Sequence, residues 1–322
     1  MSEEYQSLEQ WIVRNRRTGL RCVVQTDASG VSAFPSRGEV GCRVLPQDET
    51  SAIRVARRLS RCKIPYAVVG AGTNLLVGDR GARCVCLDMR DVRAPMRNVG
   101  YGVFYVPAGV RLSALAAQAR HAGLSGLEAL SGIPGTVGGA VAMNAGAFGT
   151  EIGQRVVCVR AMRRTGNVVL RSGEQMQWGY RDSAIARTGE IVLGAYLRLE
   201  TDDPDRIGAR MEVYRAKRAA SQPAQPSLGS VFRRAEGRSA GWYIERAGLK
   251  GLALNGVAIS TKHANFIVAQ SDGACADDFV RLARLAAEQV DKHCAVTLQY
   301  EVKILTDFGI ADPQGYCVCL TE

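Results

Sequence analysis

Ser230 lies in the stretch Gly229-Ser-Val-Phe232, which offers no obvious way to make a serine reactive. A serine hydroxyl becomes a nucleophile when a base takes its proton, and the usual base is histidine. The chain has three histidines, His121, His263 and His293, and none is close to Ser230 in the sequence. The residues alone therefore predict an ordinary turn serine, and they leave open what chemistry a hydroxyl without a base could perform.

A glycine-containing loop, Gly70-Ala-Gly-Thr-Asn-Leu-Leu-Val-Gly78, follows a short apolar run. Closely spaced glycines after a strand bring backbone N–H groups near a phosphate. Asp88, at the end of the next predicted strand, invites a nicotinamide-binding Rossmann interpretation. That interpretation fails, because the third glycine is out of place and Leu75-Leu-Val77 predicts a strand where a helix is needed. A Walker loop is excluded because the loop contains no Gly-Lys-Ser/Thr.

A second glycine-rich segment extends from Gly126 to Gly149 and includes Ser131-Gly-Ile-Pro-Gly-Thr-Val-Gly-Gly-Ala-Val-Ala-Met-Asn-Ala-Gly146. Glycine loses more backbone entropy on folding than any other residue, so many glycines weaken a purely structural element. Close approach of the backbone to a large ligand explains them. A glycine-rich surface loop explains them equally well on composition alone.

Length and charge restrict the class of protein. A chain of 322 residues predicts two or three compact units, and 47% hydrophobic residues without an apolar run of membrane length predict a soluble protein. The acidic N-terminal start does not resemble a secretory signal, so we expect a cytoplasmic location. The net charge of +10 favours anionic partners. Phosphorylated small molecules are favoured over nucleic acid, because basic clusters such as Arg14-Asn-Arg-Arg17 lack interleaved aromatics.

The ten cysteines are scattered and show no paired metal-ligand spacing. Cys84-Val-Cys86 and Cys317-Val-Cys319 place two sulfurs on one face of a strand. We expect reduced cysteines that act as small apolar side chains, and no metal site.

Periodicity and stop signals predict an α+β chain with mixed sheets. Helices are expected at 48–63, 111–121, 202–221, 239–247 and 276–293, and strands at 66–70, 83–88, 101–107, 155–163, 167–171, 191–200, 264–269 and 297–305. The strands at 155–163 and 167–171 flank Thr165-Gly166 and predict a hairpin. The Gln222-Pro-Ala-Gln-Pro226 turn follows the charged helix, and we place a domain boundary near Asp203.

Two segments, Val68-Val-Gly-Ala-Gly-Thr-Asn-Leu-Leu-Val-Gly-Asp-Arg-Gly81 and Ser131 to Gly149, resemble the flavin-binding segments of the UDP-N-acetylenolpyruvoylglucosamine reductase (UDP-N-acetylmuramate dehydrogenase) family. The resemblance covers about residues 32–305. It continues through Gly179-Tyr-Arg-Asp-Ser183, Gln222-Pro223, Gly229 to Phe232, Ala240 to Gly251, Thr261 to Val268 and Leu298-Gln-Tyr-Glu-Val302.

The resemblance implies a two-part FAD-binding domain of the vanillyl-alcohol-oxidase-like type and a separate α+β substrate-binding domain. The expected boundaries are 1–95 and 96–203 for the two FAD-binding subdomains, 204–305 for the substrate-binding domain and 306–322 for a C-terminal tail. It also implies non-covalent FAD, NADPH as reductant and reduction of the enolpyruvyl double bond of UDP-N-acetylglucosamine enolpyruvate. We further expect a monomer without nucleic-acid or membrane partners.

Site residues are implied by the same resemblance. Arg181 binds the substrate carboxylate and the developing enolate, Ser230 donates the proton, and Glu301 assists polarisation, although by residue type the arginine and the glutamate predict exposed surface charges. The implied cofactor contacts are Gly70, Ala71, Gly72, Thr73, Asn74, Leu75, Gly135, Thr136, Gly138, Gly139, Ala140, Asn144 and Gly146. The implied substrate contacts are Tyr180, Arg234, His263, Asn265 and Lys303, with a satisfied core histidine equally open for His263.

The chain departs from the family pattern in two places. Arg233-Arg-Ala235 stands where the family has a basic residue, Asn and Pro. Arg234 therefore replaces an asparagine that is expected to contact the substrate, and its guanidinium could bind phosphate instead. Phe34-Pro-Ser-Arg-Gly38 stands where a double glycine is usual. About fifty residues separate Arg181 from Ser230, which is typical of the shorter subclass without a substrate-closing loop.

Two other functions remain open. A sugar or alcohol oxidase of the same fold could attach flavin covalently through Cys84, Cys86 or His121. A flavin- or nucleotide-binding protein without catalysis is the other alternative, and it is disfavoured by the joint presence of Arg181, Ser230 and Glu301.

Overall fold

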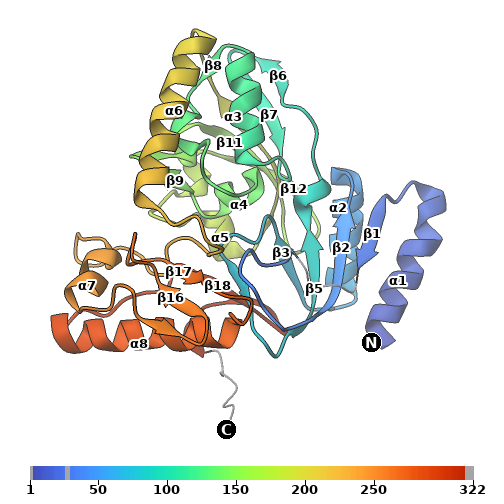
Figure 1. The fold of residues 1–322 in the computed structure, drawn as a ribbon. Coiled ribbons are helices and arrows are strands. Elements are labelled where there is room, and N and C mark those ends of the chain that lie inside the picture. Colours follow the sequence, from blue (N-terminus) through green and yellow to red (C-terminus); the bar gives the residue numbers. More distant parts are fainter. Residues whose placement is uncertain (1–2, 26–29, 316–322) are drawn as a thin grey trace. The chain divides into compact units, whose positions relative to one another are not determined.

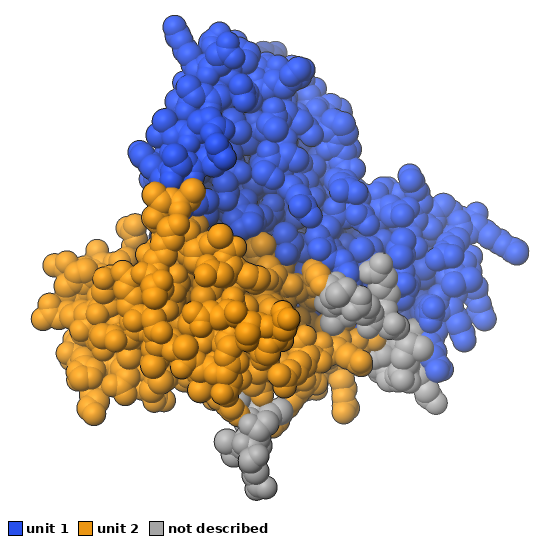
Figure 2. All heavy atoms as spheres, in the orientation of Figure 1, with its two compact units in different colours: residues 1–25, 42–71, 85–218 blue, residues 26–41, 72–84, 219–322 orange. Residues whose placement is uncertain are grey.

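The computed structural model describes residues 3–25 and 30–315, which form two compact units (Figure 1). Unit 1 contains residues 3–25, 42–71 and 85–218, and unit 2 contains residues 30–41, 72–84 and 219–315. Figure 2 colours unit 1 blue and unit 2 orange. Each unit is discontinuous in sequence, because the chain enters unit 2 twice before its long C-terminal passage.

The first core of unit 1 surrounds a four-stranded sheet of order β1-β2-β5-β3. Its strands are β1 (Cys22–Gln25), β2 (Val40–Pro46), β3 (Tyr66–Val69) and β5 (Ala82–Asp88), and its helices are α1 (Glu3–Asn15) and α2 (Glu49–Arg61). Asp48 caps α2 by accepting a hydrogen bond from the Ser51 N–H at 2.7 Å. The buried residues Ala52, Val55 and Leu59 form the apolar stripe of α2.

The second core of unit 1 surrounds a five-stranded antiparallel sheet of order β12-β11-β13-β7-β6. Its members are β6 (Arg97–Gly100), β7 (Val103–Pro107), β11 (Val156–Met162), β12 (Val168–Ser172) and β13 (Ile191–Arg198). Helices α3 (Leu112–His121) and α6 (Pro204–Ser221) meet where the Arg120 guanidinium donates to the Pro204 carbonyl. Two separate cores within unit 1 agree with a two-part domain.

Unit 2 has one core, built mainly on helix α8 (Ala276–Cys294). Its buried residues Phe279, Val280 and Ala283 recur at helical spacing. The three-stranded sheet of β15 (Ala253–Leu254), β16 (Val257–Ile259) and β17 (Ile267–Ala269) belongs to this unit, as does α7 (Ala240–Arg246). A second sheet has the order β19-β18-β4, from β19 (Gly309–Ala311), β18 (Lys303–Thr306) and β4 (Leu75–Val77).

The remaining elements are short. They are β8 (Leu124–Ser125), α4 (Val137–Ala142), β9 (Gly146–Ala147), β10 (Thr150–Glu151), α5 (Ala184–Thr188) and β14 (Glu200–Thr201), with 3₁₀ turns at Arg16–Thr18, Met89–Asp91, Glu128–Leu130, Ile152–Gln154, Glu174–Met176 and Pro313–Gly315. Within the described ranges, no helix combines the length and the apolar character needed to cross a membrane.

Most predicted elements are confirmed, including the hairpin, in which Met162 pairs with Val168. The strand predicted at 297–305 is wrong over its first half, because regular pairing begins only at Lys303. Before that point the segment meets residues 231–233 in a single bridge between Phe232 and Tyr300. Cys84 and Cys86 are buried thiols that form no disulfide, as predicted, whereas Cys317 and Cys319 lie outside the described residues.

Candidate active site

Gly70 and Thr136 bring the two predicted flavin-binding segments together within unit 1. Gly70 follows β3, and a Cβ atom at this position would lie 2.5 Å from the Thr136 Oγ1 atom. Thr136 is buried and caps α4, with its Oγ1 accepting a hydrogen bond from the Gly139 N–H at 3.4 Å. Glycine at residue 70 permits this close approach without displacement of the Thr136 side chain.

Helix α4 shows why the second segment is rich in glycine. The N–H groups of Val137 and Gly138 donate to the Val110 and Ala108 carbonyls at 2.8 Å, and a Cβ at Gly138 would lie 3.0 Å from the Ala108 Cβ. Gly139 is exposed, and a Cβ there would meet only Thr136 Oγ1, at 3.6 Å. The glycines therefore serve close chain packing at Gly138 and leave an open backbone surface at Gly139, whereas Ala140 is buried beneath it.

Other predicted cofactor residues also meet protein groups. The Gly135 carbonyl accepts from the Leu112 N–H at 3.0 Å. In unit 2, Gly72 has φ +69° and its carbonyl accepts from the Ala33 N–H at 3.0 Å. Ala71 and Thr73 are half-buried and Leu75 is buried.

Arg181 lies at the tip of a tight turn in unit 1. Gly179 and Asp182 exchange both backbone hydrogen bonds, at 3.0 and 3.2 Å, which leaves Tyr180 and Arg181 as the two corner residues. Arg181 has φ +54°, a left-handed conformation that a non-glycine residue adopts at a cost. Its guanidinium carbon is 5.3 Å from the centre of the exposed Tyr180 ring, and its Nη2 donates to the Gly146 carbonyl at 3.1 Å.

Asn144 connects this turn to the glycine-rich segment. Its side chain is fully buried, and its Nδ2 donates to the Gly179 carbonyl at 2.9 Å and to the Glu151 Oε2 atom at 2.8 Å. Its Oδ1 accepts from the Gly153 N–H at 3.1 Å. Both amide hydrogens of Asn144 are therefore used by protein acceptors.

Ser230 belongs to a segment of unit 2 that a buried asparagine holds in place. Asn265 is 5% exposed, and its side chain accepts from the Phe232 N–H at 3.0 Å and donates to the Phe232 carbonyl at 2.8 Å. The Val231 N–H also donates to the Asn265 carbonyl, at 2.8 Å. Ser230 is half-buried and follows Gly229, which has φ +74°.

Glu301 lies beside the Ser230 segment. Its N–H donates to the carbonyl of Val231, the residue directly after Ser230, at 2.8 Å. Glu301 is 7% exposed, and its carbonyl accepts from the Asn74 Nδ2 at 3.0 Å. The structure thus brings together two predicted catalytic residues, Ser230 and Glu301, and one predicted cofactor residue, Asn74.

The predicted substrate contacts have mixed surroundings. Lys303 forms an ion pair with Asp312, and Arg234 is exposed. His263 Nδ1 accepts from the Asn265 N–H at 3.2 Å, and its ring lies 4.8 Å from the Phe266 ring. Burial lowers the pKa of His263 below its usual range. The structure therefore gives His263 and Asn265 scaffold roles, and their contacts with substrate remain predictions.

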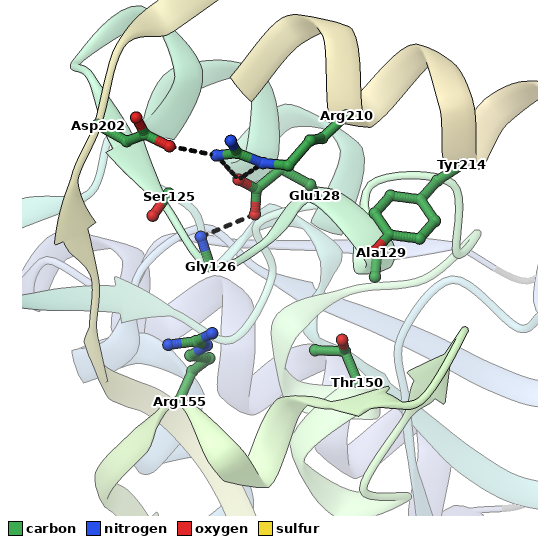
Figure 3. Close-up of a pocket in the computed structure, with 9 residues that line it drawn as sticks. All are labelled: Ser125, Gly126, Glu128, Ala129, Thr150, Arg155, Asp202, Arg210 and Tyr214. Atoms are coloured by element: carbon green, nitrogen blue, oxygen red, sulfur yellow. Dashed lines mark hydrogen bonds and ion pairs between the residues drawn. The ribbon is translucent and has the colours of Figure 1, made fainter. Parts of the chain in front are cut away.

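A polar cavity of about 330 Å³ lies elsewhere in unit 1 (Figure 3). Its walls carry Glu128, Arg155 and Arg210, and Figure 3 shows the Arg210 guanidinium between the Asp202 and Glu128 carboxylates. Burial acts to raise the pKa of Glu128, but hydrogen bonds from Arg210 and from the backbone outweigh burial and hold this pKa below its usual range. None of the predicted site residues lines this cavity.

The sequence did not predict the partners of the site asparagines. Glu151, Gly153 and Gly179 carry no signal of their own, because a backbone contact cannot be read from residue type. Ser183 is an exception, because a serine before a helix is typical of a capping residue, and Ser183 does cap α5. Its Oγ also donates to the Ala142 carbonyl at 2.7 Å.

Two sequence families match the chain. "UDP-N-acetylenolpyruvoylglucosamine reductase, C-terminal domain" matches residues 222–305, and "FAD binding domain" matches residues 40–171. These matches confirm the predicted fold class, an FAD-binding domain with a separate C-terminal domain. Among the described residues, no cluster of three or more potential metal ligands is found.

Individual relatives agree with these families. The UDP-N-acetylenolpyruvoylglucosamine reductase of Clostridioides difficile is 38% identical over 85% of this chain and 90% of its own length. That of Geobacter metallireducens is 40% identical over 81% of this chain and 86% of its own length. The crystal structure of the reductase from Thermus caldophilus is 31% identical, with a TM-score of 0.73, over 88% of this chain and 98% of that one.

Proposed function

The chain belongs to the UDP-N-acetylenolpyruvoylglucosamine reductase family, and from this premise we propose that it reduces the enolpyruvyl double bond of UDP-N-acetylglucosamine enolpyruvate to give UDP-N-acetylmuramate, a peptidoglycan precursor. NADPH is the reductant and FAD is the bound cofactor. The observation that supports this function best is the pairing of the Ser230 segment with the Glu301 segment through the Val231 carbonyl.

The residues of unit 1 fit a flavin. Gly70 and Gly139 present backbone without side chains on either side of Thr136, and Gly139 is exposed. We propose that this surface and the Gly70–Leu75 loop hold the cofactor, because oriented N–H groups neutralise a pyrophosphate without a lysine. Bound FAD supplies hydride transfer, from NADPH to the cofactor and then to the substrate.

Arg181 is proposed to hold the substrate carboxylate. Addition of hydride to the terminal vinyl carbon places negative charge on the carbon next to that carboxylate. A guanidinium forms paired, charge-assisted hydrogen bonds with a carboxylate and stabilises the enolate form of this charge. Two backbone hydrogen bonds between Gly179 and Asp182 close the turn that carries Arg181.

Ser230 is proposed to donate the proton. The new C–H bond forms as the O–H bond of Ser230 breaks, and the hydroxyl regains a proton from solvent. Electrons and protons then balance, with one hydride from NADPH and one proton added across the double bond. Glu301 assists by polarising the substrate from a neighbouring position, and its low exposure keeps competing water away from it.

The finer assignments are proposals as well. Tyr180, Arg234 and Lys303 are proposed around the UDP-sugar, and Asn265, with His263 as its hydrogen-bond partner, is proposed to support the Ser230 segment. We propose FAD-binding subdomains at 1–95 and 96–203, a substrate-binding domain at 204–305 and a tail from 306 onwards. These boundaries differ from those of the two compact units, because residues 204–218 belong to unit 1 and residues 30–41 and 72–84 belong to unit 2. A monomeric, cytoplasmic enzyme without nucleic-acid or membrane partners is also proposed, and light scattering of the purified protein tests its oligomeric state.

The decisive experiment is anaerobic stopped-flow spectroscopy of the purified, flavin-loaded protein. NADPH should bleach the flavin absorbance, and UDP-N-acetylglucosamine enolpyruvate should restore it in a stoichiometric amount. Reoxidation by oxygen but not by the UDP-sugar would contradict the proposal and favour an oxidase. A flavin that NADPH cannot bleach would favour a binding protein without catalysis.

Covalent attachment of flavin is tested in the same sample. Cys84 and Cys86 are each 0% exposed, so neither sulfur presents a surface to a cofactor, whereas His121 is exposed. We expect denaturation in acid to release all the flavin into the supernatant. Flavin that stays with the precipitate would indicate a covalent bond.

A further inference from the structure

We propose that Asn144 is a positioning residue for Arg181, and that its side chain holds the Arg181 turn instead of contacting the cofactor. The inference rests on the proposed function, because it concerns the step in which Arg181 acts on the enolpyruvyl group. It changes the role expected for Asn144 from its place in a flavin-binding segment.

The hydrogen bonds of Asn144 carry this inference. One Nδ2 hydrogen is directed to the Gly179 carbonyl and the other to Glu151, and Oδ1 accepts from Gly153. The side chain is 0% exposed, so it presents no surface to a ligand. Gly179 is two residues from Arg181 and forms one side of the turn that carries it.

Two further contacts connect the same short stretch to the same turn. The Gly146 carbonyl accepts from the Arg181 guanidinium at 3.1 Å, and the Ala142 carbonyl accepts from the Ser183 hydroxyl at 2.7 Å. Residues 142, 144 and 146 therefore each bind a part of the segment 179–183. Asn144 is the one of the three that holds the turn through its side chain.

The backbone at residue 144 favours asparagine or glycine. Asn144 has φ +43°, a left-handed conformation that these two residue types adopt most readily. Asn144→Gly therefore deletes the side chain at a backbone conformation that glycine tolerates. Asn144→Asp keeps the size and the acceptor for Gly153, but it replaces the Nδ2 group, which carries both N–H donors, by a single oxygen that faces Glu151 and the Gly179 carbonyl.

The test separates the two half-reactions in Asn144→Asp and Asn144→Gly. We expect flavin content and the rate of bleaching by NADPH to stay within about twofold of wild type. The rate of reoxidation by the enolpyruvyl UDP-sugar should fall by about 10- to 100-fold, because displacement of a catalytic group by about 1 Å costs up to about 10²-fold. If Asn144→Asp does not accumulate as a folded holoenzyme, Asn144→Gly carries the same measurement.

A double-mutant cycle shows whether Asn144 acts through Arg181. In an Arg181→Ala background, Asn144→Asp should slow reoxidation by less than about twofold further, because the group that it positions is gone. Asn144→Asp with Glu151→Gln removes the repulsion between carboxylates and restores the 144–151 hydrogen bond, but it leaves the Gly179 carbonyl without its donor. This double variant should remain slow.

Asn255→Asp is the matched control. Asn255 also has a positive φ, +45°, and its Nδ2 donates to the Asp278 carboxylate at 3.3 Å, in a β15–β16 hairpin without predicted site residues. Asn255→Asp should therefore leave the rates of both half-reactions unchanged.

Loss of flavin or equally slowed bleaching in the Asn144 variants would overturn the positioning role and indicate a cofactor contact. Full additivity with Arg181→Ala, or recovery in the Glu151→Gln double variant, would overturn it too. Failure of the proposed function gives a different result, because the UDP-sugar would then fail to reoxidise the flavin of the wild-type protein as well.

Discussion

Gly70→Ala should disturb the junction between the two proposed flavin-binding segments. The added Cβ would lie 2.5 Å from Thr136 Oγ1, closer than Cβ contacts occur in real proteins. Thr136 is 2% exposed, so its side chain has no route into solvent and must rotate within the core. Rotation withdraws Oγ1 from the Gly139 N–H and removes the side-chain cap of α4.

The expected cost follows from these contacts. A capping residue contributes about 0.5–2 kcal/mol, and the 3.4 Å length of this bond places it near the low end, about 0.5–1 kcal/mol. A strained rotamer adds about 0.5–1.5 kcal/mol. The reduced entropy of the unfolded chain with alanine offsets about 0.4–1 kcal/mol. The net loss of unfolding free energy is about 1 kcal/mol, and a similar loss in cofactor binding weakens FAD affinity by about fivefold to tenfold.

Urea unfolding of the flavin-free protein measures the first quantity, and quenching of FAD fluorescence on titration measures the second. Thr136→Ala is the matched partner, because it removes the clashing atom together with the cap. The double variant should be about as stable as Thr136→Ala alone. Additive losses, or a Gly70→Ala protein as stable as wild type, would show that the two segments are not in contact as described.

Three further predictions concern other parts of the site. Ser230→Ala should slow reoxidation by the UDP-sugar by about 10²- to 10⁴-fold and leave bleaching by NADPH unchanged; equal slowing of both in stopped flow would refute its role as proton donor. Asn265→Ala should destabilise the protein by about 2–4 kcal/mol in urea, because it leaves both backbone groups of the buried Phe232 unpaired, and a loss below about 1 kcal/mol would contradict this. Folding lowers the pKa of Glu128, so its ionised form stabilises the protein above the unfolded pKa, and stability should fall as the pH drops below about 4.5. Glu128→Gln should flatten this dependence of stability on pH in acid-unfolding curves. An unchanged slope would contradict the stabilising role of the ionised Glu128.

Local chemistry made parts of the fold predictable. A helix was predicted at 48–63, and it is confirmed as α2 (Glu49–Arg61), with Asp48 as its cap. The β11–β12 hairpin follows from two β-rich runs around Thr165-Gly166. The strand Leu75–Val77 was enough to exclude a Rossmann loop, and it is confirmed as β4. Each of these features depends on residues that are close in sequence.

Other features depend on distant partners and were not predictable. The alternation in residues 297–302 is typical of a strand, but the neighbour of this segment is the irregular stretch 231–233, about seventy residues earlier in the printed sequence, and only one bridge forms. The glycine-rich segment predicted close approach to a ligand or a surface loop. The structure adds a third cause, because a Cβ at Gly138 would lie only 3.0 Å from the Ala108 Cβ.

Both proposed catalytic segments depend on a buried asparagine that binds backbone. Asn144 holds the Gly179 carbonyl beside the Arg181 turn, and Asn265 binds both polar groups of the Phe232 backbone beside Ser230. From sequence, each asparagine was assigned a ligand, because an amide that binds a cofactor or sugar has the same residue type as one that binds a peptide. Burial distinguishes the two cases, since an amide with 0% or 5% exposure has already exchanged water for protein partners. In the proposed site, Arg181 and Ser230 are half-buried groups for the chemistry, and the buried amides keep their backbones in place.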